Sequence, residues 1–127
     1  MDEIINGIQQ IGIGVSDTKT VFNWYRNYLG FDILLFKDVA TATLMSKYTD
    51  GAPQRRDAYL SLNLRGGGGL EIWQFKDRTP TGPKAPILWG DLGINAMKLR
   101  TADIQHSYKR ISKLKLSYFS EILQHDI

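Results

Sequence analysis

The chain has 127 residues, a net charge of +3 at pH 7 and no cysteine. Its length is within the range of one domain with one core, and its 43% hydrophobic content excludes a disordered chain. The lack of cysteine excludes disulfides and thiolate catalysis. Because the sequence has neither a secretory signal pattern nor an apolar run that could cross a bilayer, we expect a cytoplasmic protein with no membrane partner.

Much of the positive charge lies in the last third of the chain. The basic residues there are Lys98, Arg100, Lys109, Arg110, Lys113 and Lys115. A nucleic-acid surface would combine such cations with interleaved aromatic side chains on one face. A solvated helix face explains the same cluster more simply, so we expect no nucleic-acid partner.

The first predicted strand, residues 8–15, alternates between large apolar and small or polar side chains. The apolar face, expected to pack on a helix, carries Ile11, Ile13 and Val15. The opposite face carries Gln10, Gly12 and Gly14. Two glycines on that face leave room for another group to lie against it.

An amphipathic helix is predicted after this strand. Its apolar side chains recur at helical steps and are Val21, Phe22, Tyr25, Tyr28 and Leu29. Asp17 or Thr18 can cap the first turn, because a short side-chain oxygen there accepts an unpaired backbone N–H. Gly30 can end the helix, since glycine adopts the left-handed conformation without a steric penalty. A second strand over residues 31–36 completes a strand–helix–strand unit.

Two short patterns in this unit carry a family resemblance. The strand ends in Val-Ser-Asp at residues 15–17, and the helix closes with Phe-x-x-Tyr-Arg-x-x-Leu-Gly-Phe at residues 22–31. Together they resemble the first βαβββ module of the vicinal oxygen chelate superfamily. That superfamily includes glyoxalase I, bleomycin-resistance proteins, methylmalonyl-CoA epimerase, fosfomycin-resistance enzymes and extradiol dioxygenases. The resemblance implies an α+β fold of the glyoxalase/bleomycin-resistance type.

Residues 39–44 are compatible with a β conformation, and residues 46–54 have the composition of an exposed loop. The third strand of the module is predicted over residues 58–64. We expect its core face to carry Leu60, Leu62 and Leu64, and its other face to carry Tyr59, Ser61 and Asn63. Four glycines at residues 66–69 predict a hairpin connection and not a phosphate loop, because no Lys-Ser/Thr pair follows them.

The fourth strand is predicted over residues 70–75. Leu70 and Ile72 continue the core face, so Glu71, Trp73 and Phe75 share the other face with Gln10. A concave apolar surface with a few polar groups is typical of small-molecule sites. We therefore predict a substrate pocket formed by Tyr59, Ser61, Asn63, Trp73 and Phe75.

The rest of the chain predicts a connector and a partial repeat of the opening module. We expect a first module over residues 1–76, a proline-rich connector over 77–92 and a partial second module over 93–127. The second module would contain a strand within residues 94–103, helix 104–113 and strand 116–120. A second module like the first would need about two further strands. The last predicted strand would also leave an unpaired sheet edge, and proteins normally cover such edges. We therefore expect a truncated product, or a chain completed by a missing carboxyl-terminal segment or by a second copy in a homodimer.

The resemblance also implies metal ligands. Metal-using members take one ligand from the first strand and a glutamate from the fourth, which correspond here to Gln10 and Glu71. An amide oxygen and a carboxylate are hard donors that suit a divalent ion, here Ni, Zn, Fe or Mn. In the second module the first position falls on Ala96, or on Asn95 if the strand slips by one residue, and the glutamate is missing.

Each candidate residue also has a plain structural interpretation. Gln10 can be a polar side chain satisfied by hydrogen bonds, and Glu71 can be paired or solvated. The three aromatic candidates can simply pack the sheet. His106 and His125 have no partner at helical ligand spacing, so we expect both on the surface.

Two functions remain open at this stage. The first is a metal-dependent lyase, isomerase or dioxygenase in which Glu71 is the catalytic carboxylate, an activity implied by the resemblance alone. The second is a metal-free module that binds a small molecule, as bleomycin-resistance proteins do, with the pocket built by dimerisation. Gln10 together with Glu71 favours the first, whereas Ala96 and the missing second glutamate favour the other.

Overall fold

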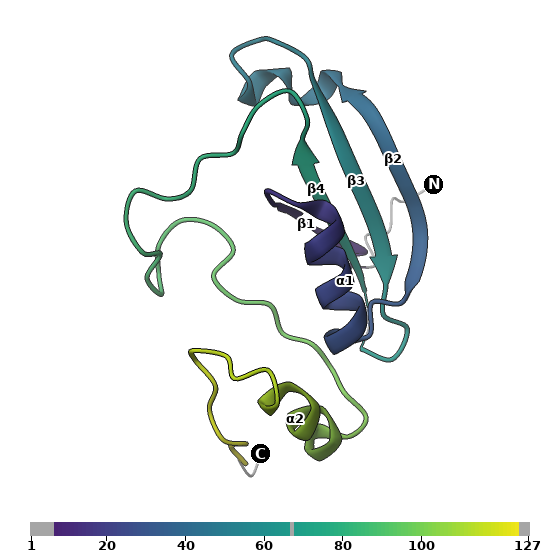
Figure 1. Ribbon diagram of the computed structural model, residues 1–127, viewed down its shortest axis with the longest axis vertical. Coiled ribbons are helices and arrows are strands. Elements are labelled where there is room, and N and C mark those ends of the chain that lie inside the picture. Colours follow the sequence, from purple (N-terminus) through teal and green to yellow (C-terminus); the bar gives the residue numbers. More distant parts are fainter. Residues whose placement is uncertain (1–6, 67, 125–127) are drawn as a thin grey trace.

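The computed structural model describes residues 7–66 and 68–124. Its centre is a four-stranded sheet in the order β1-β4-β3-β2. The strands are β1 (Gln10–Gly14), β2 (Ile33–Ala42), β3 (Gln54–Leu62) and β4 (Gly69–Phe75). β1 runs parallel to β4, and the other neighbouring pairs are antiparallel. With helix α1 (Thr18–Leu29) across one face, these elements form the predicted βαβββ module of an α+β fold (Figure 1).

Helix α1 begins and ends as the sequence predicts. Of the two expected caps, Asp17 is the N-cap, and its carboxylate accepts the backbone N–H of Thr20 at 3.0 Å. Gly30 ends the helix in the left-handed conformation, with φ of 74°, and its N–H donates to the carbonyl of Tyr25. Thr18 is buried instead, and its N–H donates to the side-chain oxygen of Gln74 at 2.7 Å. The first turn of the helix is therefore fastened to the sheet.

The hydrophobic core lies between α1 and the sheet. Its buried cluster consists of Phe22, Phe31, Tyr59, Leu70 and Ile72. Partly buried side chains packed against this cluster include Ile13, Val15, Val21, Tyr25 and Leu29. The rings of Phe22 and Tyr59 meet edge to face at 5.3 Å. The core faces predicted for the first strand, the helix and the fourth strand are confirmed at these positions.

The faces predicted for β3 are wrong. Tyr59 lies opposite Ile72, and Ser61 lies opposite Leu70, while Leu60 lies opposite Glu71. Directly opposed residues share a face of the sheet, so Tyr59 and Ser61 point toward α1 and Leu60 points away from it. Alternation could not assign these faces, because Ala58, Tyr59, Leu60 and Ser61 are all buried. When both sides of a strand are buried, apolar side chains do not mark the core side.

The edge strand β2 is longer than the sequence predicts. One strand runs through both β-compatible stretches, with an irregularity in its register between Leu34 and Phe36. The expected loop that follows begins instead as a 3₁₀ helix, Thr43–Tyr48. The ladder with β3 extends β2, because each added pair satisfies further backbone hydrogen bonds.

Helix α2 (Ile104–Ser112) forms as predicted, and the strands expected around it do not. Asp103 caps this helix by accepting the N–H of His106 at 2.8 Å. Within the described part of the chain, residues 94–100 and 116–120 belong to no strand, because no sheet edge pairs with them. Met97 and Leu99 still pack against the core cluster. No helix in the described ranges is both long and apolar enough to cross a bilayer.

Candidate functional site

The face of the sheet that points away from α1, here called the far face, carries residues from all four strands. β1 and β4 contribute Gln10, Gly12, Gly14, Glu71, Trp73 and Phe75. β2 and β3 contribute Ile33, Phe36, Arg56, Ala58 and Leu60. These residues share one face because each lies in register with a neighbour of the same set.

The structure brings Gln10 and Glu71 together on the far face, although 61 positions separate them. The side-chain amide of Gln10 donates to Oε2 of Glu71 at 2.9 Å. Arg56 donates from Nη1 to Oε1 of the same carboxylate at 2.7 Å. The Glu71 side chain is only 15% exposed, so this ion pair is partly shielded from water. Both oxygens of the carboxylate therefore already have partners within the chain.

These residues do not by themselves fit a divalent metal ion. Within residues 7–66 and 68–124, no three His, Cys, Asp or Glu side chains cluster closely enough to hold one. Gln10 and Glu71 supply two protein donors. Divalent ions normally have several more ligands, which would have to come from water or from another chain. Arg56 also places a positive charge against Glu71, which opposes a second cation there. The metal ligands therefore remain a prediction that needs donors from elsewhere.

The aromatic part of the far face is built around Trp73. Its indole ring covers Gly14, where an added Cβ would lie 3.2 Å from a ring carbon. Phe75 meets Trp73 edge to face at a centroid distance of 5.1 Å, and the Arg78 guanidinium lies 5.9 Å from the centre of the Phe75 ring. The space that the glycines of β1 leave is thus occupied by Trp73 from the neighbouring strand. Trp73 and Phe75 form a partly exposed aromatic shelf beside Glu71.

The five predicted pocket residues separate into two groups. Trp73 and Phe75 lie on the far face with Glu71, as expected. Tyr59 and Ser61 lie on the helix side, in the core and against the Leu70 carbonyl respectively. Asn63 is buried beyond the end of β3, where its amide donates to the Leu29 carbonyl at 2.7 Å. Their predicted position beside Glu71 is corrected, because the inverted faces of β3 turn Tyr59 and Ser61 away from it.

Arg56 is the residue that sequence reasoning missed. β3 begins at Gln54, four residues earlier than predicted, so Arg56 belongs to the strand and not to the loop before it. Two-residue alternation from Leu60 places Arg56 on the same face as Glu71. A strand extended backward, with its faces assigned correctly, would have shown a cation on the side of the sheet that holds the carboxylate.

Comparison with known proteins supports the fold. No protein-family model matches this sequence. No curated protein matches it either. Among solved structures, the crystal structure of a glyoxalase family protein from Bacillus cereus superposes with a TM-score of 0.64, covering 98% of this chain and 82% of that chain. The two sequences are 13% identical, so the likeness concerns the fold. The chain therefore has the glyoxalase-type α+β fold that its opening motif predicts.

Proposed function

We propose that this protein binds a small planar molecule on its far face without a metal ion, in the manner of bleomycin-resistance proteins. The observation that carries the proposal is the environment of Glu71. Its carboxylate is neutralised by Arg56 and hydrogen-bonded by Gln10, directly beside the Trp73–Phe75 shelf. An aromatic surface next to a few fixed polar groups suits a flat ligand, because the rings supply contact area and the polar groups set orientation.

A second copy of the chain would complete this site. Ligand pockets normally bury most of the ligand, whereas the shelf is a partly exposed surface. The same face also exposes apolar side chains on the edge strand, with Phe36 39% and Ile33 38% exposed. A homodimer that covered this face would both bury these side chains and supply the opposite wall of the pocket.

Ligand binding can be tested by fluorescence with acridine orange, a planar cation, and 2-naphthol, a planar neutral molecule. Replacing Trp73 by alanine should weaken binding of the preferred probe by about tenfold or more, because stacking on an aromatic ring is lost. Trp89→Ala is the matched control, since Trp89 is 85% exposed and lies in the connector. Equal affinities of the two variants would contradict the proposal. Light scattering at increasing protein concentration would test the dimer.

The metal-dependent lyase, isomerase or dioxygenase is the second candidate. One observation favours it, namely that Gln10 and Glu71 contact each other on one face and could reach a common ion. Purified protein would then contain stoichiometric Ni, Zn, Fe or Mn, and both Gln10→Ala and Glu71→Ala would lose it. Wild-type protein that remains metal-free after incubation with each of these ions would favour the binding module.

A further inference from the structure

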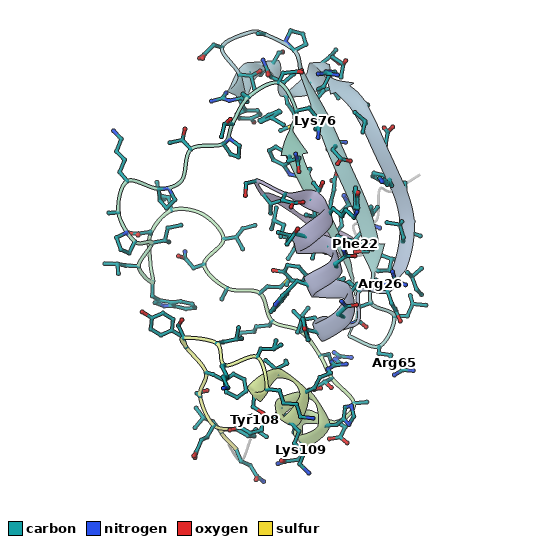
Figure 2. All side chains as sticks on the ribbon, viewed as in Figure 1. Phe22, Arg26, Arg65, Lys76, Tyr108 and Lys109 are labelled. Carbon is teal, nitrogen blue, oxygen red and sulfur yellow. The ribbon has the colours of Figure 1, made fainter. Side chains whose placement is uncertain are left out.

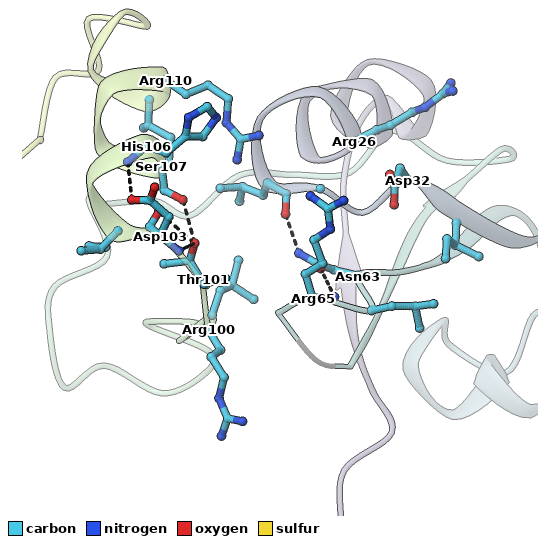
Figure 3. Close-up of a pocket in the computed structure, with 18 residues that line it drawn as sticks. Arg26, Asp32, Asn63, Arg65, Arg100, Thr101, Asp103, His106, Ser107 and Arg110 are labelled. Atoms are coloured by element: carbon cyan, nitrogen blue, oxygen red, sulfur yellow. Dashed lines mark hydrogen bonds between the residues drawn. The ribbon is translucent and has the colours of Figure 1, made fainter.

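A cleft of about 690 Å³ lies away from Glu71 and the aromatic shelf. It opens between the carboxyl end of α1, the turn between β3 and β4, and α2 with the segment before it (Figure 3). Its cationic lining residues are Arg26, Arg65, Arg100 and Arg110, and His106 also lines it. Trp73, Phe75 and Glu71 of the proposed ligand shelf do not line this cleft, whereas Ile33, at the edge of the far face, does. The cleft is therefore a separate site with its own chemistry.

The arginines of this cleft have no ion-pair partners among the described residues. The ion pairs found there join Arg55 to Asp77 and Arg56 to Glu71, both outside the cleft. Two aspartates also line the cleft, but the Asp103 carboxylate caps α2, and Asp32 has no described cation within ion-pair distance. Across the whole lining, four arginines therefore outnumber two aspartates.

Two of the arginines define where an anion would sit. In Figure 3 the guanidinium groups of Arg65 and Arg110 point toward one another, whereas Arg26 and Arg100 point away from the cleft. An oxyanion placed between two guanidinium groups is attracted by both. The planar fork of N–H donors on arginine matches the oxygens of a phosphate or a carboxylate.

The backbone on each side of the cleft is held in place. Asn63 accepts the N–H groups of Arg65 at 2.9 Å and Gly66 at 2.7 Å, and its own amide is bonded to the end of α1. On the other side, the hydroxyls of Thr101 and Ser107 lie 2.8 Å apart at the start of α2. These bonds limit backbone movement, so less entropy would be lost when a ligand binds.

The remaining lining indicates the size and kind of ligand. Apolar walls are provided by Leu29, Leu99, Ile104 and Ile111. Among the described lining residues there is no Phe, Tyr or Trp on which a nucleic-acid base could stack. An aliphatic body with one acidic group fits this combination of apolar walls and paired guanidinium groups.

We propose that the cleft binds a small organic anion, with its phosphate or carboxylate between Arg65 and Arg110 and its apolar part against Leu99 and Ile111. This site is independent of the ligand shelf on the far face. Arg110 is the residue of the basic last third that would contact this anion.

Calorimetry at constant ionic strength tests the proposal with butyl phosphate, pentanoate and inorganic phosphate as probes. We expect Arg65→Gln and Arg110→Gln each to weaken the preferred probe by about tenfold or more, because a charge-assisted fork of hydrogen bonds is lost. Lys109→Gln is the matched control, since it removes the same charge from an exposed position on α2 outside the cleft (Figure 2). Its affinity should change by less than about twofold, because exposed charges are screened.

The comparison of probes identifies the ligand class. Tighter binding of butyl phosphate than of pentanoate assigns a phosphate, the reverse assigns a carboxylate, and an advantage of either over inorganic phosphate confirms the apolar wall. No binding of any probe up to about 10 mM, where affinity would be negligible, would overturn the proposal. An equal loss in Lys109→Gln, or tighter binding of a single-stranded oligonucleotide, would also overturn it. Trp73→Ala should leave this binding unchanged, which separates failure here from failure of the proposed shelf.

Discussion

The amino-terminal module and the carboxyl-terminal third share a local sequence signal but differ in how they are built. In each, an aspartate caps a helix through a backbone N–H three residues ahead, Asp17 for α1 and Asp103 for α2. Helix α1 buries Thr18 and Phe22 against the sheet, whereas α2 buries no residue fully. The comparison teaches that a capping pattern specifies a helix, and that only packing against strands turns the helix into part of a core.

Removing one aromatic ring from each region should give the largest difference. Phe22→Ala empties a site in the buried cluster and should lower the free energy of unfolding by about 3–5 kcal/mol. Tyr108 stacks on Phe119 at 5.0 Å on the partly exposed side of α2, so Tyr108→Ala should cost less than about 1 kcal/mol. Urea unfolding measures both values. Similar losses in stability would show that Tyr108 is packed as tightly as Phe22.

A glycine from each region gives the next largest contrast. Gly14→Ala places a Cβ 3.2 Å from the Trp73 ring, so the indole must shift by a few tenths of an ångström, and because the ring is partly exposed stability should fall by no more than about 1 kcal/mol. Gly82 in the connector has no atom within 4 Å of an added Cβ, and Gly82→Ala should leave stability nearly unchanged. Thermal unfolding and tryptophan emission report both effects. An unshifted emission maximum in Gly14→Ala would show that the ring does not rest on β1.

Removing the two helix caps should give a smaller difference between the two regions. Asp17→Ala should lower the midpoint of global urea unfolding, because α1 is coupled to the core through Phe22. Asp103→Ala should leave that midpoint unchanged and instead speed amide exchange in the first turn of α2, because local opening there does not disturb the sheet. Serine at either position can still cap and provides the control. A global loss in Asp103→Ala would show that α2 is coupled to the core.

The smallest expected effect is the change in stability at acid pH that comes from Asp17 and Asp77. Hydrogen bonds from the Thr20 side chain and N–H lower the pKa of Asp17, and those from Arg55 lower the pKa of Asp77. A lowered pKa in the folded state means that each contribution is present above the unfolded-state pKa and is lost as the pH falls through the folded value. Both groups are exposed, so Asp17→Asn with Asp77→Asn should flatten the acid limb of the stability curve only slightly.

The shared face of Gln10 and Glu71 could be predicted from sequence, because it follows from two strands with clear alternation. Each strand has one apolar face that must meet α1, so the polar residues between must share the other face. The third partner, Arg56, could not be predicted in the same way. It lies on a strand whose two faces are both buried, and there the hydrophobic pattern carries no information about direction.

Sequence alone determined the elements whose signals are local: helix α1 with its end at Gly30, helix α2, and the core sides of β1 and β4. Tertiary structure decided the rest. Strand pairing, the orientation of β3 and the presence of Arg65 and Arg110 in one cleft depend on which distant segments become neighbours. Caps and alternation act over a few residues, whereas a strand or a cleft exists only once a partner from elsewhere in the chain satisfies its backbone or forms its opposite wall.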